Sequence, residues 1–123
     1  MDNQPDDSIR IEVIQGGLFK DSYPGMLPPI AHETTKKTGI LHKDGVISMA
    51  RLAPGTATSE FFICIGDQPE LDYGGERNPD GQGFAAFGKV IGGMEVVREI
   101  QSQYTDGQYL TPQIKIISIV HME

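Results

Sequence analysis

Residues 59–65 read Ser-Glu-Phe-Phe-Ile-Cys-Ile, and this stretch does most to set the fold. Two aromatic and two β-branched residues within 60–65 predict a β-strand. Neighbouring side chains on a strand point to opposite faces, so one of Phe61 and Phe62 must face the core. Cys64 is the only cysteine, which rules out an intramolecular disulfide and a cysteine-based zinc site. We expect it to be a buried, unreactive thiol.

Further strands are predicted on both sides of this stretch, separated by glycine-rich loops. Alternating or continuous apolar residues indicate strands at 9–15, 46–51, 84–91 and 113–121. Both faces of 113–121 are apolar, so we expect this strand to be buried on both sides. A helical period predicts one helix, over 94–103. The pattern indicates a mainly β protein, an antiparallel barrel or sandwich with a helix at one end, and a two-layer α+β fold is the alternative.

The length fits one domain, with 123 residues in all. Residues 1–8 are polar and read as a solvated tail or loop, which leaves 9–123 for the domain. Residues 18–43 have no clear period and contain several prolines, so we expect an extended, ordered loop there.

The charge balance excludes several classes of partner. Ten basic residues stand against 17 acidic ones, a net charge of -7, which argues against nucleic acid and against a polybasic membrane contact. No apolar run approaches the roughly 20 residues of a membrane span. The first residues show no signal peptide, so a cytoplasmic location is expected by default. The isolated His32, His42 and His121 lack metal-ligand spacing; we expect them to be exposed or locally hydrogen-bonded, and we expect no metal or cofactor.

Four blocks of sequence, in this order, carry a family resemblance. They are Ile14-Gln15-Gly16-Gly17, residues 45–50, residues 59–63 and residues 87–97. Together they resemble the cyclophilin family of peptidyl-prolyl cis-trans isomerases, from about Ile9 to the C-terminus. The loop at 78–83, Asn-Pro-Asp-Gly-Gln-Gly, is similar to that of bacterial members.

The resemblance implies a cyclophilin-like antiparallel β-barrel capped by helices, and it implies an activity. Family members catalyse rotation about X-Pro bonds in peptides and proteins and so assist folding. Without a catalyst this rotation takes tens to hundreds of seconds. Gln15 matches the glutamine that supports the catalytic arginine and the peptide. The positions that match the substrate-binding pocket are Val13, Ala50, Arg51, Phe62, Leu71 and Phe84. Of these, Arg51 replaces a usual asparagine and Phe84 a usual histidine.

The start of the chain departs from the family pattern. Family members carry two strands, a helix and the catalytic arginine before the block that contains Gln15, whereas only 14 residues precede Gln15 here. Arg10 lies among them, but its neighbours do not match the segment that holds the family arginine. We therefore expect a domain that is incomplete at its N-terminus and lacks the family arginine, with an open barrel edge that favours self-association.

Three functions stay open at this point. The first is an isomerase acting on proline-containing peptides or unfolded proteins. The second is a non-catalytic prolyl-peptide binding or chaperone-like module. The third is a fragment that needs its missing part or a second copy.

Overall fold

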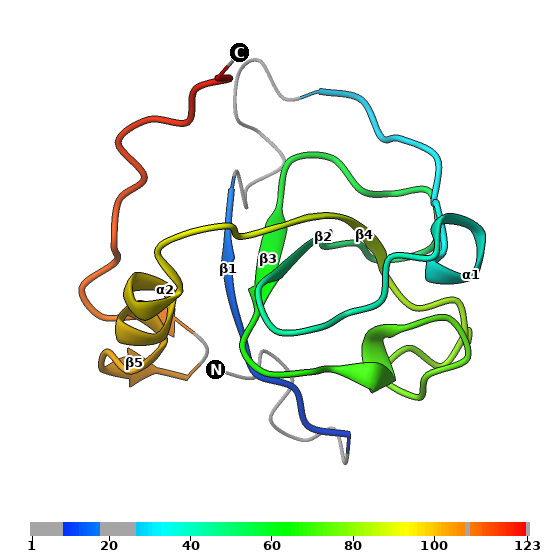
Figure 1. Cartoon of the computed structure of the whole chain (residues 1–123), viewed down its shortest axis with the longest axis horizontal. Helices are drawn as coiled ribbons and strands as arrows, with labels where there is room; N and C mark the ends of the chain where they lie inside the picture. Colours follow the sequence, from blue (N-terminus) through cyan, green and yellow to red (C-terminus); the bar gives the residue numbers. More distant parts are fainter. Residues whose placement is uncertain (1–8, 18–26, 108, 123) are drawn as a thin grey trace.

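The structure, a computed structural model, describes residues 9–17, 27–107 and 109–122, which form two sheets and short helices joined by long loops (Figure 1). The elements follow in the order β1 (Val13–Gly16), α1 (Thr35–Thr38), β2 (Val46–Met49), β3 (Phe61–Cys64), the 3-10 helix η1 (Pro69–Leu71), β4 (Ala85–Lys89), α2 (Met94–Gln101), β5 (Thr105–Asp106) and β6 (Tyr109–Leu110). The predicted tail at 1–8 lies outside the described residues, as does part of the predicted 18–43 loop.

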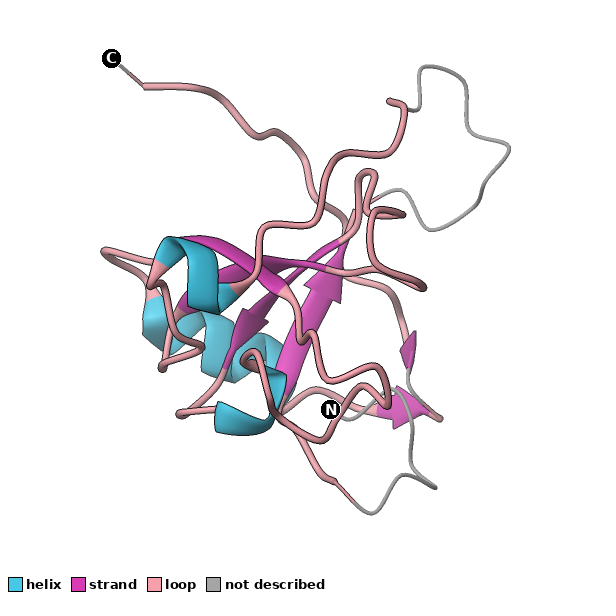
Figure 2. Ribbon diagram, turned by 90° about the vertical axis from the view of Figure 1, so that its right-hand side faces the viewer, coloured by secondary structure: helices cyan, strands magenta, loops and turns pink. Residues whose placement is uncertain are grey.

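The main sheet has the strand order β1-β3-β2-β4, and each neighbouring pair is antiparallel. The strand predicted from residues 60–65 is therefore central, between β1 and β2. Figure 2 shows the strands crossing at an angle, as in a twisted sheet. The prediction of a mainly β, antiparallel fold is confirmed. Over the described residues these four strands form an open sheet, with β1 and β4 at its two sides.

The predicted strands 9–15, 46–51, 60–65 and 84–91 each overlap an observed strand that is shorter, and β1 extends one residue beyond its predicted end. Pairing nevertheless continues past the strand ends: the Ile65 N–H donates to the Glu12 carbonyl at 2.9 Å, and the Ala50 N–H donates to the Glu60 carbonyl at 3.0 Å. Gly17 ends β1 in a left-handed conformation (φ 113°), and its backbone lies so close to Ser59 that a side chain would collide there.

The predicted helix at 94–103 is confirmed as α2, which ends at Gln101. It packs against β1 and buries Val97. Gly93 precedes it in a left-handed conformation with φ 90°. The described part of the predicted 18–43 loop holds one short helix, α1, which the sequence did not predict; its start is capped by the Thr34 hydroxyl, which accepts from the Lys37 N–H at 3.2 Å. No helix among the described residues has the length and apolar character needed to cross a membrane.

The prediction of a doubly buried strand at 113–121 is wrong. The segment runs past α2 at the edge of the molecule without joining either sheet of the described chain (Figure 1). Ile117 is 93% exposed, and Ile114, on the side nearer α2, is still 47% exposed. An apolar pattern shows that burial of a segment is favourable, but a strand also needs a neighbouring strand to pair with its backbone N–H and C=O groups.

Candidate functional site

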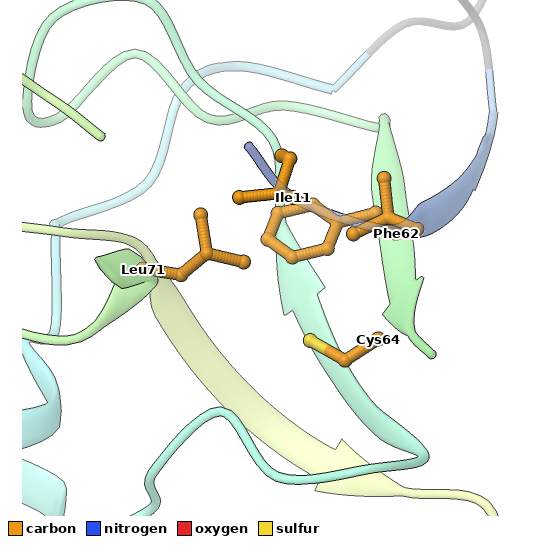
Figure 3. Packing of buried hydrophobic residues seen from close by; sticks show 5 residues of the cluster. Ile11, Phe62, Cys64 and Leu71 are labelled. Carbon is orange, nitrogen blue, oxygen red and sulfur yellow. The ribbon is translucent and has the colours of Figure 1, made fainter. Parts of the chain in front are cut away.

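A cluster of buried side chains links β1, β3 and η1 on one face of the sheet (Figure 3). Phe62 of β3 is 3% exposed and Leu71 of η1 is fully buried, and Figure 3 shows the Leu71 side chain pointing toward the Phe62 ring. Ala50 and Phe84 pack against this cluster and remain partly exposed. The cluster itself consists of Ile11, Val13, Phe62, Cys64 and Leu71. We call these five residues the Phe62 cluster.

The register of the sheet explains why these residues meet. Val13 lies opposite Cys64, and Gln15 lies opposite Phe62. Because directly opposed residues in an antiparallel pair share a face, Val13, Gln15, Phe62 and Cys64 all project to the same side. Val13 is buried there, whereas Gln15 is exposed. Its side-chain amide donates to the Glu60 carboxylate at 3.4 Å. Gln15 is therefore placed beside the Phe62 cluster with its amide within reach of solvent.

An aromatic pair borders the cluster on the β4 side. The rings of Phe62 and Phe84 meet edge to face, with centroids 5.2 Å apart and an interplanar angle of 86°. This is a favoured geometry, because the positive edge of one ring meets the negative face of the other. Ala50 and Phe84 provide apolar surface that a ligand can reach, and Phe62 lies behind them.

Arg51 follows directly after Ala50, and its side chain is only 1% exposed. Its guanidinium carbon lies 5.2 Å from the centre of the Phe84 ring. Nη1 and Nη2 donate to the two carboxylate oxygens of Asp80 at 3.0 and 3.1 Å. Nε and Nη2 donate to the Gly83 carbonyl at 3.0 and 2.5 Å, and Nη1 also donates to the Leu52 carbonyl at 2.7 Å. Hydrogen bonds from Arg51 hold the pKa of Asp80 below its ordinary range.

A hydrogen-bond chain lies behind Phe62. The His42 ring stacks on Phe62 with centroids 6.0 Å apart and 15° between the planes. His42 Nδ1 lies 2.7 Å from Asp72 Oδ1, and His42 Nε2 lies 2.8 Å from Ser48 Oγ. Burial lowers the pKa of His42 even though Asp72 acts in the opposite direction. The ring is thus neutral at pH 7, and it donates to Asp72 and accepts from Ser48. We call His42, Ser48 and Asp72 the His42 chain.

The His42 chain has the order of groups found in serine hydrolases, but its burial excludes that chemistry. Ser48 has no exposed surface and His42 is 1% exposed, so no substrate carbonyl can reach the hydroxyl. The two hydrogen bonds of the His42 chain instead hold the His42 ring in place against one face of the Phe62 ring. The sequence predicted an exposed or locally hydrogen-bonded His42; the structure buries it and pairs it with Ser48 and with the distant Asp72.

The structure thus brings together the seven predicted site residues. Val13, Phe62 and Leu71 are in the Phe62 cluster, with Ala50, Phe84, Arg51 and Gln15 around it. Sequence reasoning did not assign Ile11 to the site, and it missed the His42 chain. The alternation of 9–13 could have indicated Ile11. Within the described ranges no group of three histidine, cysteine, aspartate or glutamate residues could hold a metal ion.

A separate groove lies beside β4 and contains none of the predicted site residues. It has a volume of about 390 Å³. Its apolar lining includes Ile30, Ile40, Met49 and Phe87. It offers an apolar ligand another place to dock, and it therefore supplies a control for the Phe62 cluster.

Comparison with known proteins identifies the family of the chain. A sequence profile described as cyclophilin type peptidyl-prolyl cis-trans isomerase/CLD matches residues 8–121. The chain is 37% identical over 97 residues to peptidyl-prolyl cis-trans isomerase B of Escherichia coli (strain K12), covering 76% of this chain and 57% of that protein. It is 36% identical over 115 residues to a peptidyl-prolyl cis-trans isomerase of Acinetobacter baylyi, covering 87% of this chain and 58% of that protein.

A third relative, peptidyl-prolyl cis-trans isomerase A of Dickeya dadantii, is 38% identical over 97 residues, which cover 76% of this chain and 48% of the relative. The chain spans about half the length of the curated relatives it matches. The profile covers nearly all of the chain, from residue 8 to residue 121. The chain therefore belongs to the cyclophilin-type peptidyl-prolyl cis-trans isomerase family.

Proposed function

We propose that the protein is a peptidyl-prolyl cis-trans isomerase that acts on X-Pro bonds in peptides and unfolded protein segments. The observation that carries the proposal is that Ala50 and Phe84 present apolar surface over the Phe62 cluster, with Gln15 on the same face beside it. A proline ring is apolar and rigid, and such a surface suits it. The amide of Gln15 is a donor and acceptor for the peptide backbone next to that ring.

Isomerisation needs no covalent step, only a site that holds the twisted X-Pro bond more tightly than the planar one. A fixed wall for the proline ring and a polar hold on the neighbouring peptide group favour that twist. The Phe62 ring is held from both sides, by the stack on His42 and by the edge contact with Phe84. We therefore expect the Phe62 ring behind the proposed binding surface to hold its position before a ligand arrives.

A second candidate function is prolyl-peptide binding without isomerisation, and one observation at Arg51 favours it. The arginine nearest the Phe62–Phe84 pair has its N–H groups directed to Leu52, Asp80 and Gly83. It therefore cannot donate to the prolyl nitrogen as amide resonance is lost. Loss of one such donor typically lowers catalysis by ~100-fold or more. Acceleration of isomerisation by the protein would exclude this second function.

The binding site can be located by amide shift mapping. We expect a tetrapeptide that contains an X-Pro bond to shift the amide signals of Gln15, Ala50 and Phe84. The same peptide with alanine in place of proline should shift them far less. Equal shifts with both peptides would contradict recognition of proline. Shifts centred on Ile30 and Phe87 would place the ligand in the separate groove and refute the proposed site.

A further inference from the structure

Arg51 is a buried cation whose hydrogen-bonding capacity is fully used within the protein. A guanidinium has five N–H donors. The five bonds at this side chain run to the Leu52 and Gly83 carbonyls and to both oxygens of Asp80. Its side chain is 1% exposed, so a peptide can approach neither its donors nor its outer face. The family resemblance placed Arg51 among the substrate-binding positions, but direct contact of its guanidinium with a peptide does not fit this geometry.

Two of the three residues that accept from Arg51, Asp80 and Gly83, belong to the loop that delivers Phe84. Asp80 Oδ1 also accepts from the Gln82 N–H at 2.9 Å, which fixes the turn ahead of Gly83. Gly83 has φ 64°, and a side chain there would collide with the backbone of Leu71. The Phe84 N–H donates to the Leu71 carbonyl at 2.9 Å. The loop is thus held on one side by Leu71 and on the other by Arg51.

Phe84 consequently has one cation and one aromatic ring as neighbours. The guanidinium lies over its face at 5.2 Å, and Phe62 meets it edge to face at 5.2 Å. We propose that the Arg51–Asp80 pair is a clamp that fixes the Phe84 ring against Phe62, so that Arg51 is a positioning residue for prolyl-peptide binding. This inference rests on the proposed function, because the surface that the clamp fixes is the one assigned to proline.

The clamp depends on the planar fork of arginine and on the charge of Asp80. Lysine at position 51 keeps the charge but cannot make two parallel bonds to a carboxylate or stack its plane on a ring. Asparagine at position 80 keeps the shape but turns an N–H₂ group toward the guanidinium. We therefore expect Arg51→Lys and Asp80→Asn each to weaken binding of a prolyl tetrapeptide by about tenfold, which corresponds to ~1.4 kcal/mol.

Two readouts test the clamp, and the first does not depend on activity. 4-Fluorophenylalanine placed at position 84 reports the state of its ring by ¹⁹F NMR. We expect one narrow resonance in the parent protein, and a shifted or broadened one after Arg51→Lys or Asp80→Asn. The second readout is the dissociation constant of the tetrapeptide. The double variant should bind no more weakly than the weaker single variant, because both changes break the same interaction.

Matched controls come from a second arginine–aspartate pair. Arg98 Nη2 and Asp44 Oδ2 are 2.7 Å apart, but these side chains are 51% and 38% exposed. Arg98→Lys and Asp44→Asn repeat the same chemical changes away from Phe84, and we expect both readouts to be unchanged.

The outcomes separate this inference from the proposed function. An unchanged ¹⁹F resonance in Arg51→Lys and Asp80→Asn would overturn the clamp. A changed resonance with unchanged peptide affinity would overturn the role of Arg51 in binding while leaving the proposed function intact. If the parent protein binds no prolyl peptide, the proposed function fails and the positioning role falls with it, whatever the resonance shows.

Discussion

The His42 chain should make the stability of the fold depend on pH near neutrality. Burial lowers the pKa of His42 below its ordinary value of 6.5, against the weaker opposing effect of Asp72. The folded protein therefore resists protonation of this ring, while the unfolded chain accepts the proton with a pKa of about 6.5. Below that pH the unfolded state binds more protons than the folded state, so acid destabilises the fold.

The size of the effect follows from proton linkage. One group contributes a slope that approaches ~1.4 kcal/mol per pH unit between its unfolded pKa and its lower folded pKa. Above about pH 7.5 the contribution is constant, because the ring is neutral in both states. Asp44 and Asp80 also have lowered pKa values, but their ordinary value is 3.8. Protonation of these two aspartates therefore destabilises the fold only at a more acidic pH. The effect of His42 on the free energy of unfolding can thus be measured separately.

Urea unfolding between about pH 5 and about pH 8, the range in which histidine titrates, measures this dependence. We expect the free energy of unfolding of the parent protein to fall on acidification, and that of His42→Gln to stay level over the same range. The exposed His121 offers a control, and His121→Gln should follow the parent curve. Parallel curves for the parent and His42→Gln would refute the reasoning.

A second variant tests the same chain if His42→Gln does not fold. Ser48→Ala removes the hydroxyl that donates to His42 Nε2 and leaves a buried acceptor without a partner. The expected cost is ~1–3 kcal/mol of unfolding free energy at pH 7.5. In this variant a proton on His42 Nε2 would have no hydrogen-bond acceptor. The free energy of unfolding should therefore still fall on acidification.

Three further predictions concern stability and reactivity. Phe62→Ala should lower the unfolding free energy by ~3–5 kcal/mol because it opens a cavity in the core; Phe87→Ala, at a 55% exposed site, should cost less than about 1 kcal/mol in the same urea titration. Gly83→Ala and Gly81→Ala both impose a left-handed residue at ~1–2 kcal/mol, but only the first adds a backbone collision, so it should be clearly the less stable in thermal melts. Burial raises the pKa of Cys64 to about 12, so a thiol reagent should modify it in urea but not in the folded protein.

Local pattern was enough to predict most of the fold. The strands around Val46, Phe62 and Ala86 and the helix after Gly93 follow from short-range alternation and helical period, and they were found where expected. The failure at 113–121 has a physical cause. Apolar side chains such as Ile117 report a preference for burial, whereas strand formation depends on a backbone partner that the segment's own sequence does not specify.

In the site, too, the residues were predicted where a local pattern or motif marks them and were missed where the contact joins distant parts of the chain. The resemblance pointed to Gln15, Phe62 and Phe84; the register of the sheet sets Gln15 opposite Phe62, and the loop before β4 brings the Phe84 ring against Phe62. The pairing of His42 with Asp72 joins residues 30 positions apart, and that of Arg51 with Asp80 joins residues 29 positions apart. No periodic signal marks such contacts, because they arise only when two loops meet in three dimensions. For that reason the sequence assigned Arg51 to the binding site but did not predict that its side chain pairs with Asp80.

Isomerisation of an X-Pro bond by the Phe62–Phe84 surface is the central claim, and exchange NMR on a prolyl tetrapeptide tests it most directly. Uncatalysed exchange takes tens of seconds or longer, so the cis and trans signals of the free peptide give no exchange cross-peaks on a subsecond mixing time. We predict that the protein in substoichiometric amount produces these cross-peaks, that Phe84→Ala removes them and that Phe87→Ala retains them. Peptide shifts that show binding without exchange cross-peaks would contradict the claim, as would cross-peaks that survive Phe84→Ala and vanish with Phe87→Ala.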